Sequence, residues 1–287
     1  LINEGDEVLL PAPYWVTYAE IVKLAGGIPV FVDAGIDVDF KITAEQLQAK
    51  TTRNTKLMIY SSPCNPTGTV YTKNELRGIA NYFAENKGVN VIADEIYEHI
   101  TFEGKHESLA QFEDIYDQVI TINGVSKAFA MTGWRVGYMG APLWIAKACS
   151  KMQGQFTSGT CSISQRAAKA AVEAHPKETR YMTEAFDRRR KLAHGLLSEI
   201  PGLKINMPQG AFYFFPDVSS YFGKSDGKYT INNSSDLSLY LLTQANVALV
   251  TGDAFGGPNC IRFSYAAADD LLIEAMARIK TALAKLN

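Results

Sequence analysis

The sequence has no long apolar run, no strong charge imbalance and few cysteines, and each absence argues against a class of protein. No segment approaches the roughly 18 consecutive apolar residues that a membrane-spanning helix needs. The formal net charge of −2 gives no reason to expect nucleic acid or an anionic membrane as a partner. The four cysteines are scattered without a CxxC pair, which argues against a zinc site or a disulfide framework and favours a reducing cytosol.

Several well-known catalytic motifs are also missing. The sequence contains no GxGxxG dinucleotide fingerprint, no Walker GxxxxGK[ST], no HExxH and no GxSxG. The four histidines show no metal-ligand spacing. The glycine-rich stretch "GDAFGG" at 252–257 is interpreted as a loop near a site rather than as a phosphate cradle. Any chemistry must therefore come from another set of residues.

The chain is long enough, and with 47% hydrophobic residues apolar enough, for one large or two moderate domains. Short apolar segments alternate with helical periodicity up to residue 174, which predicts an α/β domain with a mostly parallel sheet sandwiched by helices. The expected strands are 7–10, 29–33, 57–61, 89–93, 119–123 and 136–140, and the expected helices are 14–25, 44–50, 73–86, 143–153 and 164–174.

The pattern changes after His175 and Pro176. A long helix over 177–199, strands at 203–206, 212–216, 248–250 and 260–264, and helices after 235 and from 269 predict a smaller α+β domain over 175–287. The chain starts without an initiator Met and runs from a helix tail straight into a strand. We therefore expect residues 1–174 to be a large domain whose N-terminal portion lies upstream.

Four unusual stretches fall at the carboxyl ends of predicted strands, where open α/β sheets bind ligands. They are "PAPYW", "SSPCNPTG", "ADEIY" and "NGVSK". Lys127 in the last of these directly follows an apolar strand, where an unpaired ammonium group is costly to bury. Although most lysines are solvated, one in this setting is expected to have a lowered pKa and to act as an amine that forms Schiff bases.

The other stretches supply polar groups that could face the same ligand. Asp94 ends a mostly apolar run, and either caps or pairs with a neighbouring helix or holds a protonated ring nitrogen. Tyr97, three residues further on, could present a phenol. "NPTG" is a strong turn in its own right, but Pro66 favours an extended Asn65, whose amide could project from the strand end as a donor.

Two arginines and one tryptophan complete the set of candidates. Arg135 follows Gly133 and Trp134 without an acidic neighbour along the chain, and its guanidinium suits a phosphate. Trp15 is either a core aromatic or a flat stacking platform. Arg262 lies in an apolar strand, where a buried arginine calls for an anion such as a substrate carboxylate.

A flat, phosphorylated pyridine aldehyde that reacts with an amino acid would use all of these groups. The sequence resembles the class I aminotransferases, pyridoxal phosphate enzymes of fold type I, and is most similar to the bacterial aspartate aminotransferase subgroup. The similarity is carried by "PAPYW", "NPTG", "ADEIY", "NGVSKAFAMTGWRVGY" and "IRFSYA", in that order, and it extends over the whole chain. It implies a large domain with a sheet of the seven-stranded type.

The resemblance also implies a role for each residue. Lys127 would form the Schiff base with pyridoxal 5'-phosphate and then move the substrate proton, while Asp94 would keep the pyridine nitrogen protonated. Tyr97 and Asn65 would donate to the ring's 3-oxygen. The remaining assignments are Trp15 stacked on the ring, Ser126 and Arg135 on the phosphate, and Arg262 on the substrate carboxylate, with Asn65 and Trp15 also beside the substrate.

At the level of the whole protein, the resemblance implies amino-acid and 2-oxo-acid substrates, with aspartate and 2-oxoglutarate as the favoured pair. It also implies a cytoplasmic homodimer with shared active sites. Alternatives are aromatic or prephenate transamination, a lyase on the same scaffold, or the effector domain of a transcription regulator. Gly124 stands where some members carry a serine, and we interpret it as a marker of the subgroup.

Overall fold

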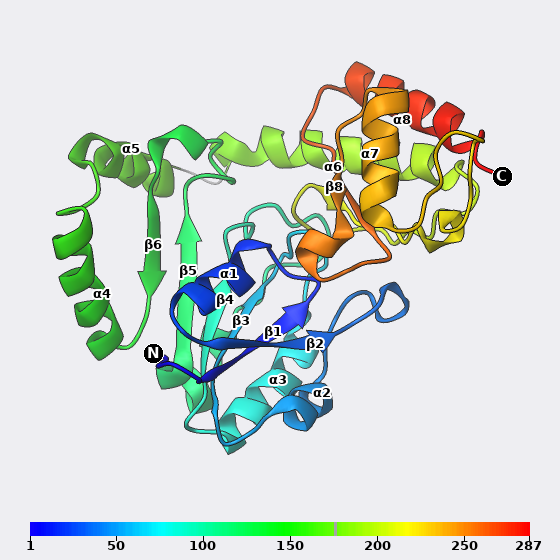
Figure 1. Cartoon of the computed structure of the whole chain (residues 1–287). Coiled ribbons are helices and arrows are strands. Elements are labelled where there is room, and N and C mark those ends of the chain that lie inside the picture. Colours follow the sequence, from blue (N-terminus) through cyan, green and yellow to red (C-terminus); the bar gives the residue numbers. More distant parts are fainter. Residues whose placement is uncertain (175–176) are drawn as a thin grey trace.

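Six strands form the larger of two sheets in the computed structural model, which describes residues 1–174 and 177–287 (Figure 1). Their order is β2-β1-β3-β4-β5-β6, and all pairs are parallel except β5 with β6. The strands are β1 (Glu7–Ala12), β2 (Ile28–Asp33), β3 (Thr55–Ser61), β4 (Asn90–Asp94), β5 (Val119–Gly124) and β6 (Gly137–Gly140). The predicted mostly parallel sheet is confirmed, with one strand fewer in this part of the chain than the seven-stranded type has.

Helices cover both faces of this sheet. Leu9 of β1 packs in a cluster with residues of α2 (Ala44–Lys50) and α3 (Lys73–Glu85). Its neighbours Val8 and Leu10 pack in a different cluster with α1 (Thr17–Leu24). Because side chains alternate between the faces of a strand, α1 lies on one face and α2 and α3 on the other. Strands buried on both faces read as nearly continuous apolar runs, which explains the sequence pattern.

The rest of the described chain forms five further α-helices and a small antiparallel sheet of order β7-β9-β8. After α4 (Leu143–Phe156) and α5 (Ser162–Glu173), the long helix α6 (Lys177–Ser198) leads to this region. The small sheet consists of β7 (Tyr213–Phe214), β8 (Val250–Thr251) and β9 (Ile261–Ser264), and it shares a core with α6, α7 (Ser234–Ala245) and α8 (Asp269–Leu283). Short 3-10 helices span Ile36–Val38, Leu109–Gln111, Glu113–Gln118, Thr132–Trp134, Ser219–Tyr221 and Gly252–Phe255.

Three element predictions need correction. The helix expected from residue 14 begins at Thr17, and the Tyr14 N–H before it donates to Phe255 O (2.9 Å). The strand expected at 203–206 is reduced to one isolated bridge, Lys204 with Asp217. The strand expected at 212–216 is only Tyr213–Phe214; Pro216, which has no N–H, ends the region that can donate to a ladder.

The predicted boundary between two domains falls at His175 and Pro176, which lie outside the described residues, so the division into 1–174 and 175–287 stays a prediction. Within the described ranges, no helix combines the length and the apolarity needed to cross a bilayer. All four cysteines are free. Cys64 and Cys260 are buried, whereas Cys149 and Cys161 are exposed.

Candidate active site

A cavity of about 500 Å³ opens where β3, β4 and β5 end. Every residue predicted for the site lines it except Arg262, which lies beside it through contact with Asn65. The lining comprises Trp15, Tyr18, Ser61, Asn65, Asp94, Ile96, Tyr97, Ile122, Gly124, Ser126, Lys127, Thr132, Arg135, Val136 and Gly137. Parallel strands bring their carboxyl ends to one edge of the sheet, which is why segments far apart in sequence meet here.

Lys127 lies in the irregular segment between β5 and β6. The Ala130 N–H donates to Lys127 O (3.2 Å) and the Met131 N–H donates to Val125 O (3.3 Å), so local backbone bonds replace a helix or strand ladder. Burial, together with the positive charges of Arg262 and Arg135, lowers the pKa of the Lys127 amine. A lowered pKa increases the fraction of neutral amine, which is the nucleophilic form.

Asp94 is the last residue of β4 and points into the cavity. Tyr18 Oη donates to its Oδ2 (2.6 Å) and the Ile96 N–H donates to its Oδ1 (3.2 Å). Burial raises the pKa of the Asp94 carboxyl, while these hydrogen bonds and the charge of Lys127 act in the opposite direction. In these hydrogen bonds, the Asp94 carboxylate neither caps a helix nor forms an ion pair with a neighbouring helix, which are the ordinary alternatives at this position.

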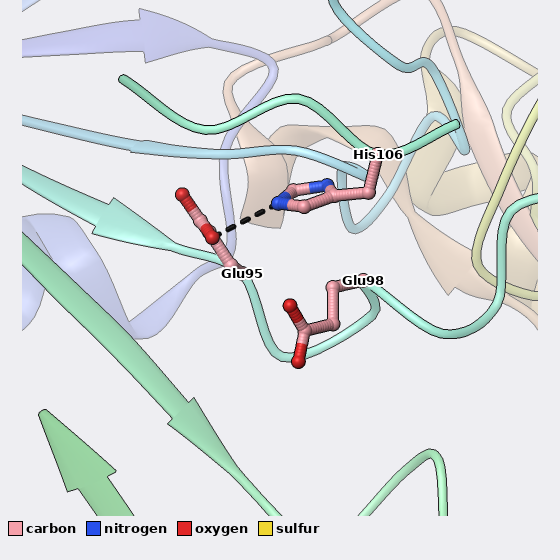
Figure 2. A group of neighbouring side chains, drawn as sticks. All are labelled: Glu95, Glu98 and His106. Carbon is pink, nitrogen blue, oxygen red and sulfur yellow. Dashed lines mark hydrogen bonds and ion pairs between the residues drawn. The ribbon is translucent and has the colours of Figure 1, made fainter. Parts of the chain in front are cut away.

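The next residue, Glu95, has a different environment, as Figure 2 shows. Its side chain is almost fully buried and is hydrogen-bonded to His106 Nε2 (2.9 Å) and Ser108 Oγ (2.6 Å). Glu98 lies nearby, and ligand atoms of Glu95, Glu98 and His106 all lie within 4.8 Å of one another. Because the Glu95 carboxylate is already engaged on both oxygens, we interpret this group as an anchor for residues 106–108.

Asn65 and Arg262 meet from the two sheets. Asn65 is buried in the turn after β3, where Gly68 (φ +70°) lets the chain reverse. Its Oδ1 accepts a hydrogen bond from Arg262 Nη1 (2.9 Å), which leaves the Asn65 amide hydrogens available to the cavity. The Arg262 guanidinium carbon lies 4.6 Å and 4.8 Å from the ring centroids of Tyr213 and Phe255. Phe255 belongs to the 252–257 loop, which therefore lies near the site as expected.

The remaining predicted residues surround the same cavity. Trp15 is 39% exposed and contacts Tyr18 edge-on (centroids 5.5 Å apart), so it is not a core aromatic. Ser126 directly precedes Lys127. Arg135 has a left-handed backbone (φ +55°), and its Nη1 donates to Thr132 O (2.9 Å). These residues leave donors near the lysine that suit an anionic group.

Two tyrosines of the site were not found from the sequence. Tyr18 holds Asp94, and Tyr213 lies with its hydroxyl oxygen 2.8 Å from that of Tyr97. Tyr18 lies in the first turn of α1, whereas Trp15 precedes that helix, so helical spacing gives no sign of the edge-on contact between the two rings. Tyr213 is one of several aromatics in "AFYFF", a run that reads as core and gives no sign of a polar task.

Gly124 ends β5 directly opposite Gly137 of the antiparallel strand β6. A Cβ atom placed on Gly124 would lie 2.9 Å from Val136 O and 3.2 Å from Ile96 Cδ1. Contacts this short force a neighbour to move, so glycine is needed here for the two strands to approach. The lysine segment that follows is thereby held close to β6.

The donor set fits a phosphorylated pyridine aldehyde. The cavity offers an amine at Lys127, a carboxylate at Asp94, and cationic and hydroxyl donors at Arg135 and Ser126. Ser61 Oγ lines the cavity and is buried without a hydrogen-bond partner in the described chain, and Arg262 Nε is enclosed in the same way. Buried polar atoms without partners are costly, and a polar ligand would satisfy them.

Comparison with known proteins agrees with this geometry. Residues 1–279 match the family model described as aminotransferase class I and II, and the chain belongs to this family. A bifunctional aspartate aminotransferase and glutamate/aspartate-prephenate aminotransferase from Petunia hybrida is 48% identical over 99% of the chain and 60% of its own length. An aspartate/prephenate aminotransferase from Cereibacter sphaeroides is 44% identical over 100% of the chain and 72% of its own length.

Solved structures agree in fold. The aspartate aminotransferase from Rhizobium meliloti superposes with a TM-score of 0.96 at 38% identity, covering 100% of the chain and 72% of that protein. An aromatic aminotransferase from Pyrococcus horikoshii superposes with a TM-score of 0.91 at 39% identity, covering 99% of the chain and 74% of that protein. The chain thus spans about three fifths of the Petunia protein and nearly three quarters of these two structures.

Proposed function

We propose that this chain forms the catalytic part of a pyridoxal phosphate-dependent aminotransferase that uses aspartate and 2-oxoglutarate. The observation that carries the proposal is the shared cavity of Lys127 and Asp94, with Arg262 at its side. When bound, the cofactor supplies an aldehyde for an amino group and a ring that withdraws electrons from the substrate. Relatives named aspartate aminotransferases at 42–48% identity support the choice of substrates.

Each residue then has a defined task. The Lys127 amine binds the cofactor and, once released, moves the proton at the Cα of the amino acid, a step that its lowered pKa favours. Asp94 faces the ring nitrogen and keeps it protonated, and Tyr18 holds its carboxylate in place. Arg262 binds the α-carboxylate of the substrate. Tyr97 and Asn65 donate to the ring oxygen, Trp15 covers the ring, and Ser126 and Arg135 bind the phosphate.

The proposal predicts a reversible colour change. The purified holoenzyme is expected to be yellow, to lose its visible absorption band when aspartate is added, and to regain it with 2-oxoglutarate. The second candidate is an aromatic or prephenate aminotransferase, which the Pyrococcus and Cereibacter relatives favour. Parallel titrations test it, with phenylalanine in place of aspartate and prephenate in place of 2-oxoglutarate. A colourless protein that takes up no pyridoxal phosphate would refute both candidates.

A second copy of the chain is the proposed partner, and the apolar surface of α4 and α5 supports this. Leu143 (68% exposed), Trp144 (60%) and Phe156 (77%) lie on α4, and Ile163 (72%) lies on α5. These helices project beyond β6 at the side away from the small sheet (Figure 1). Large exposed apolar side chains on two consecutive helices suit an interface with another protein surface. A cytosolic location remains a prediction from the cysteine pattern.

A single charge on this surface is expected to break the assembly. Replacing Trp144 with Glu would place an unpaired carboxylate in the interface, and we expect light scattering after gel filtration to show dimers shifted to monomers. Leu239→Glu is the matched control, because Leu239 is also 60% exposed but lies on α7. A monomeric wild-type protein, or equal loss of dimer in both variants, would contradict the placement of the interface.

A further inference from the structure

Tyr213 contacts two residues of the proposed active site with different parts of its side chain. Its hydroxyl oxygen lies 2.8 Å from the hydroxyl oxygen of Tyr97. Its ring centroid lies 4.6 Å from the guanidinium carbon of Arg262. Tyr97 follows a strand of the large sheet, whereas Arg262 lies on β9 of the small sheet. Tyr213 therefore links the cofactor end of the cavity to the residue assigned to the substrate carboxylate.

The hydroxyl contact has a preferred proton direction. A phenol has one proton, so if Tyr97 donates to a ligand in the cavity, it can only accept from Tyr213. A hydroxyl that accepts a hydrogen bond becomes a better donor, since chains of hydrogen bonds polarise one another. Tyr97 lines the cavity, and both tyrosines are buried. The order Tyr213 to Tyr97 to ligand is the one that uses both protons.

The backbone fixes the position of Tyr213. It lies on β7 opposite Ser264 of β9. A Cβ atom on Gly68 would lie 3.0 Å from Tyr213 O, and the Gly210 N–H donates to Gly68 O (2.8 Å). The turn that carries Asn65 thus presses directly on the strand that carries Tyr213. This close contact leaves the Tyr213 backbone little freedom to shift.

The ring contact acts on Arg262. A guanidinium over an aromatic face is attracted to the ring, and the attraction is larger where water is excluded. The Phe255 ring lies 4.8 Å from the same guanidinium carbon, and Asn65 accepts from its Nη1. Tyr213, Phe255 and Asn65 therefore orient the Arg262 guanidinium together. Of these three residues, Tyr213 is the one whose hydroxyl also contacts that of Tyr97.

We propose that Tyr213 is a positioning residue with two separable tasks: its hydroxyl donates to Tyr97, which directs the Tyr97 proton into the cavity, and its ring orients Arg262. The inference rests on the proposed function, because it takes Tyr97 to face the cofactor and Arg262 to face the substrate. The charged and titratable groups around Tyr97 are Asp94, Lys127, Tyr213 and Arg262.

The first task predicts a shift in a pH transition. A hydrogen bond from Tyr97 to the ring oxygen of a bound cofactor would withdraw negative charge from that oxygen, and the Lys127 nitrogen that holds the cofactor would then be less basic. Weaker donation therefore raises the pKa of this nitrogen. In Tyr213→Phe holoenzyme, the pH at which the visible absorption changes is expected to rise by roughly 0.1–0.3 unit, because loss of one bond in a chain weakens the next by about 10–30% of one neutral hydrogen bond.

A double-mutant cycle tests whether this shift passes through Tyr97. Tyr97→Phe removes the donor itself and is expected to raise the transition further than Tyr213→Phe does. In the double variant, Tyr213→Phe should add no further shift, because the hydroxyl that it acts on is gone. An unchanged transition in Tyr213→Phe, or the same shift with and without the Tyr97 hydroxyl, would overturn the first task.

The second task separates the ring from the hydroxyl. Tyr213→Leu removes both, whereas Tyr213→Phe keeps the ring over Arg262. The KM for each amino-acid substrate is therefore expected to be roughly 3–30-fold higher in the Leu variant than in the Phe variant. Equal KM values in two variants with normal melting temperatures would overturn this task. If the Leu variant fails to fold, Tyr213→Met, which also lacks the ring, takes its place in the same comparison with the Phe variant.

Different results would contradict the proposed function and the role of Tyr213. A wild-type protein that binds no pyridoxal phosphate overturns the proposed function and this inference together. A yellow, active wild type whose Tyr213→Phe variant behaves identically, and whose Leu variant has the same KM values as the Phe variant, overturns the inference alone.

Discussion

Replacing Lys127 with Ala is expected to reduce kcat by at least roughly 10²–10⁴-fold, the usual contribution of a positioned acid–base group. Under the proposed function, the variant lacks the amine that would bind the cofactor and move the Cα proton, whereas Asp94, Arg135 and Ser126 still line the cavity and would hold the ring and phosphate. Cofactor content should therefore fall less than turnover. Steady-state kinetics with aspartate and 2-oxoglutarate, together with the absorbance of the purified variant, measure the two effects separately.

The matched control is Lys50→Ala at the exposed end of α2, which should behave like the wild type. Borohydride reduction of the wild-type holoenzyme, followed by peptide mass spectrometry, should find the cofactor mass on the peptide that contains Lys127. Retained turnover in Lys127→Ala, or the added mass on another lysine, would contradict the assigned role and with it the main basis of the proposed function.

Replacing Arg262 with Ala is expected to lower kcat/KM for every amino-acid substrate by a similar factor. Loss of one partner of an enclosed charge pair costs about 2–5 kcal/mol, which is roughly 30-fold to several thousand-fold. The factor should be uniform because all substrates carry the same α-carboxylate. Kinetics with aspartate, glutamate and phenylalanine provide the comparison.

Arg278→Ala serves as the control, since Arg278 lies exposed on α8 and pairs only with Glu274 among the described residues. We expect less than a twofold change, as is typical for an exposed ion pair. If only the acidic substrates lose activity in Arg262→Ala, the residue contacts the side-chain carboxylate instead, and another residue must bind the α-carboxylate.

The larger sheet and most of the site could be predicted because their signals are local. Strands buried on both faces give short apolar runs, so β3, β4 and β5 were located to within two residues at each end. Residues at the ends of parallel strands must meet, so the approach of Asn65, Asp94 and Lys127 followed from order alone. The chemical roles of these residues remain predictions until variants are measured.

The parts that were missed depend on contacts between distant segments. Tyr18 bonds Asp94 across 76 positions, and Tyr213 bonds Tyr97 across 116. In both cases the residue looks like an ordinary core aromatic, since the hydroxyl finds its partner only in the folded chain. The small sheet was predicted less well than the large one because its strands are short, two residues in β7 and β8, and leave little periodicity to read.

The close packing of Gly124 against Val136 and Ile96 limits how this site can evolve. A serine at position 124 would bring its Cβ to 2.9 Å from the Val136 carbonyl oxygen unless the chain around Val136 had already moved. The order of substitutions then matters: a permissive change near Val136 or Ile96 must come first, and a serine introduced alone would be deleterious. Residue 124 and the residues that it contacts, Val136 and Ile96, are thus expected to change together during evolution.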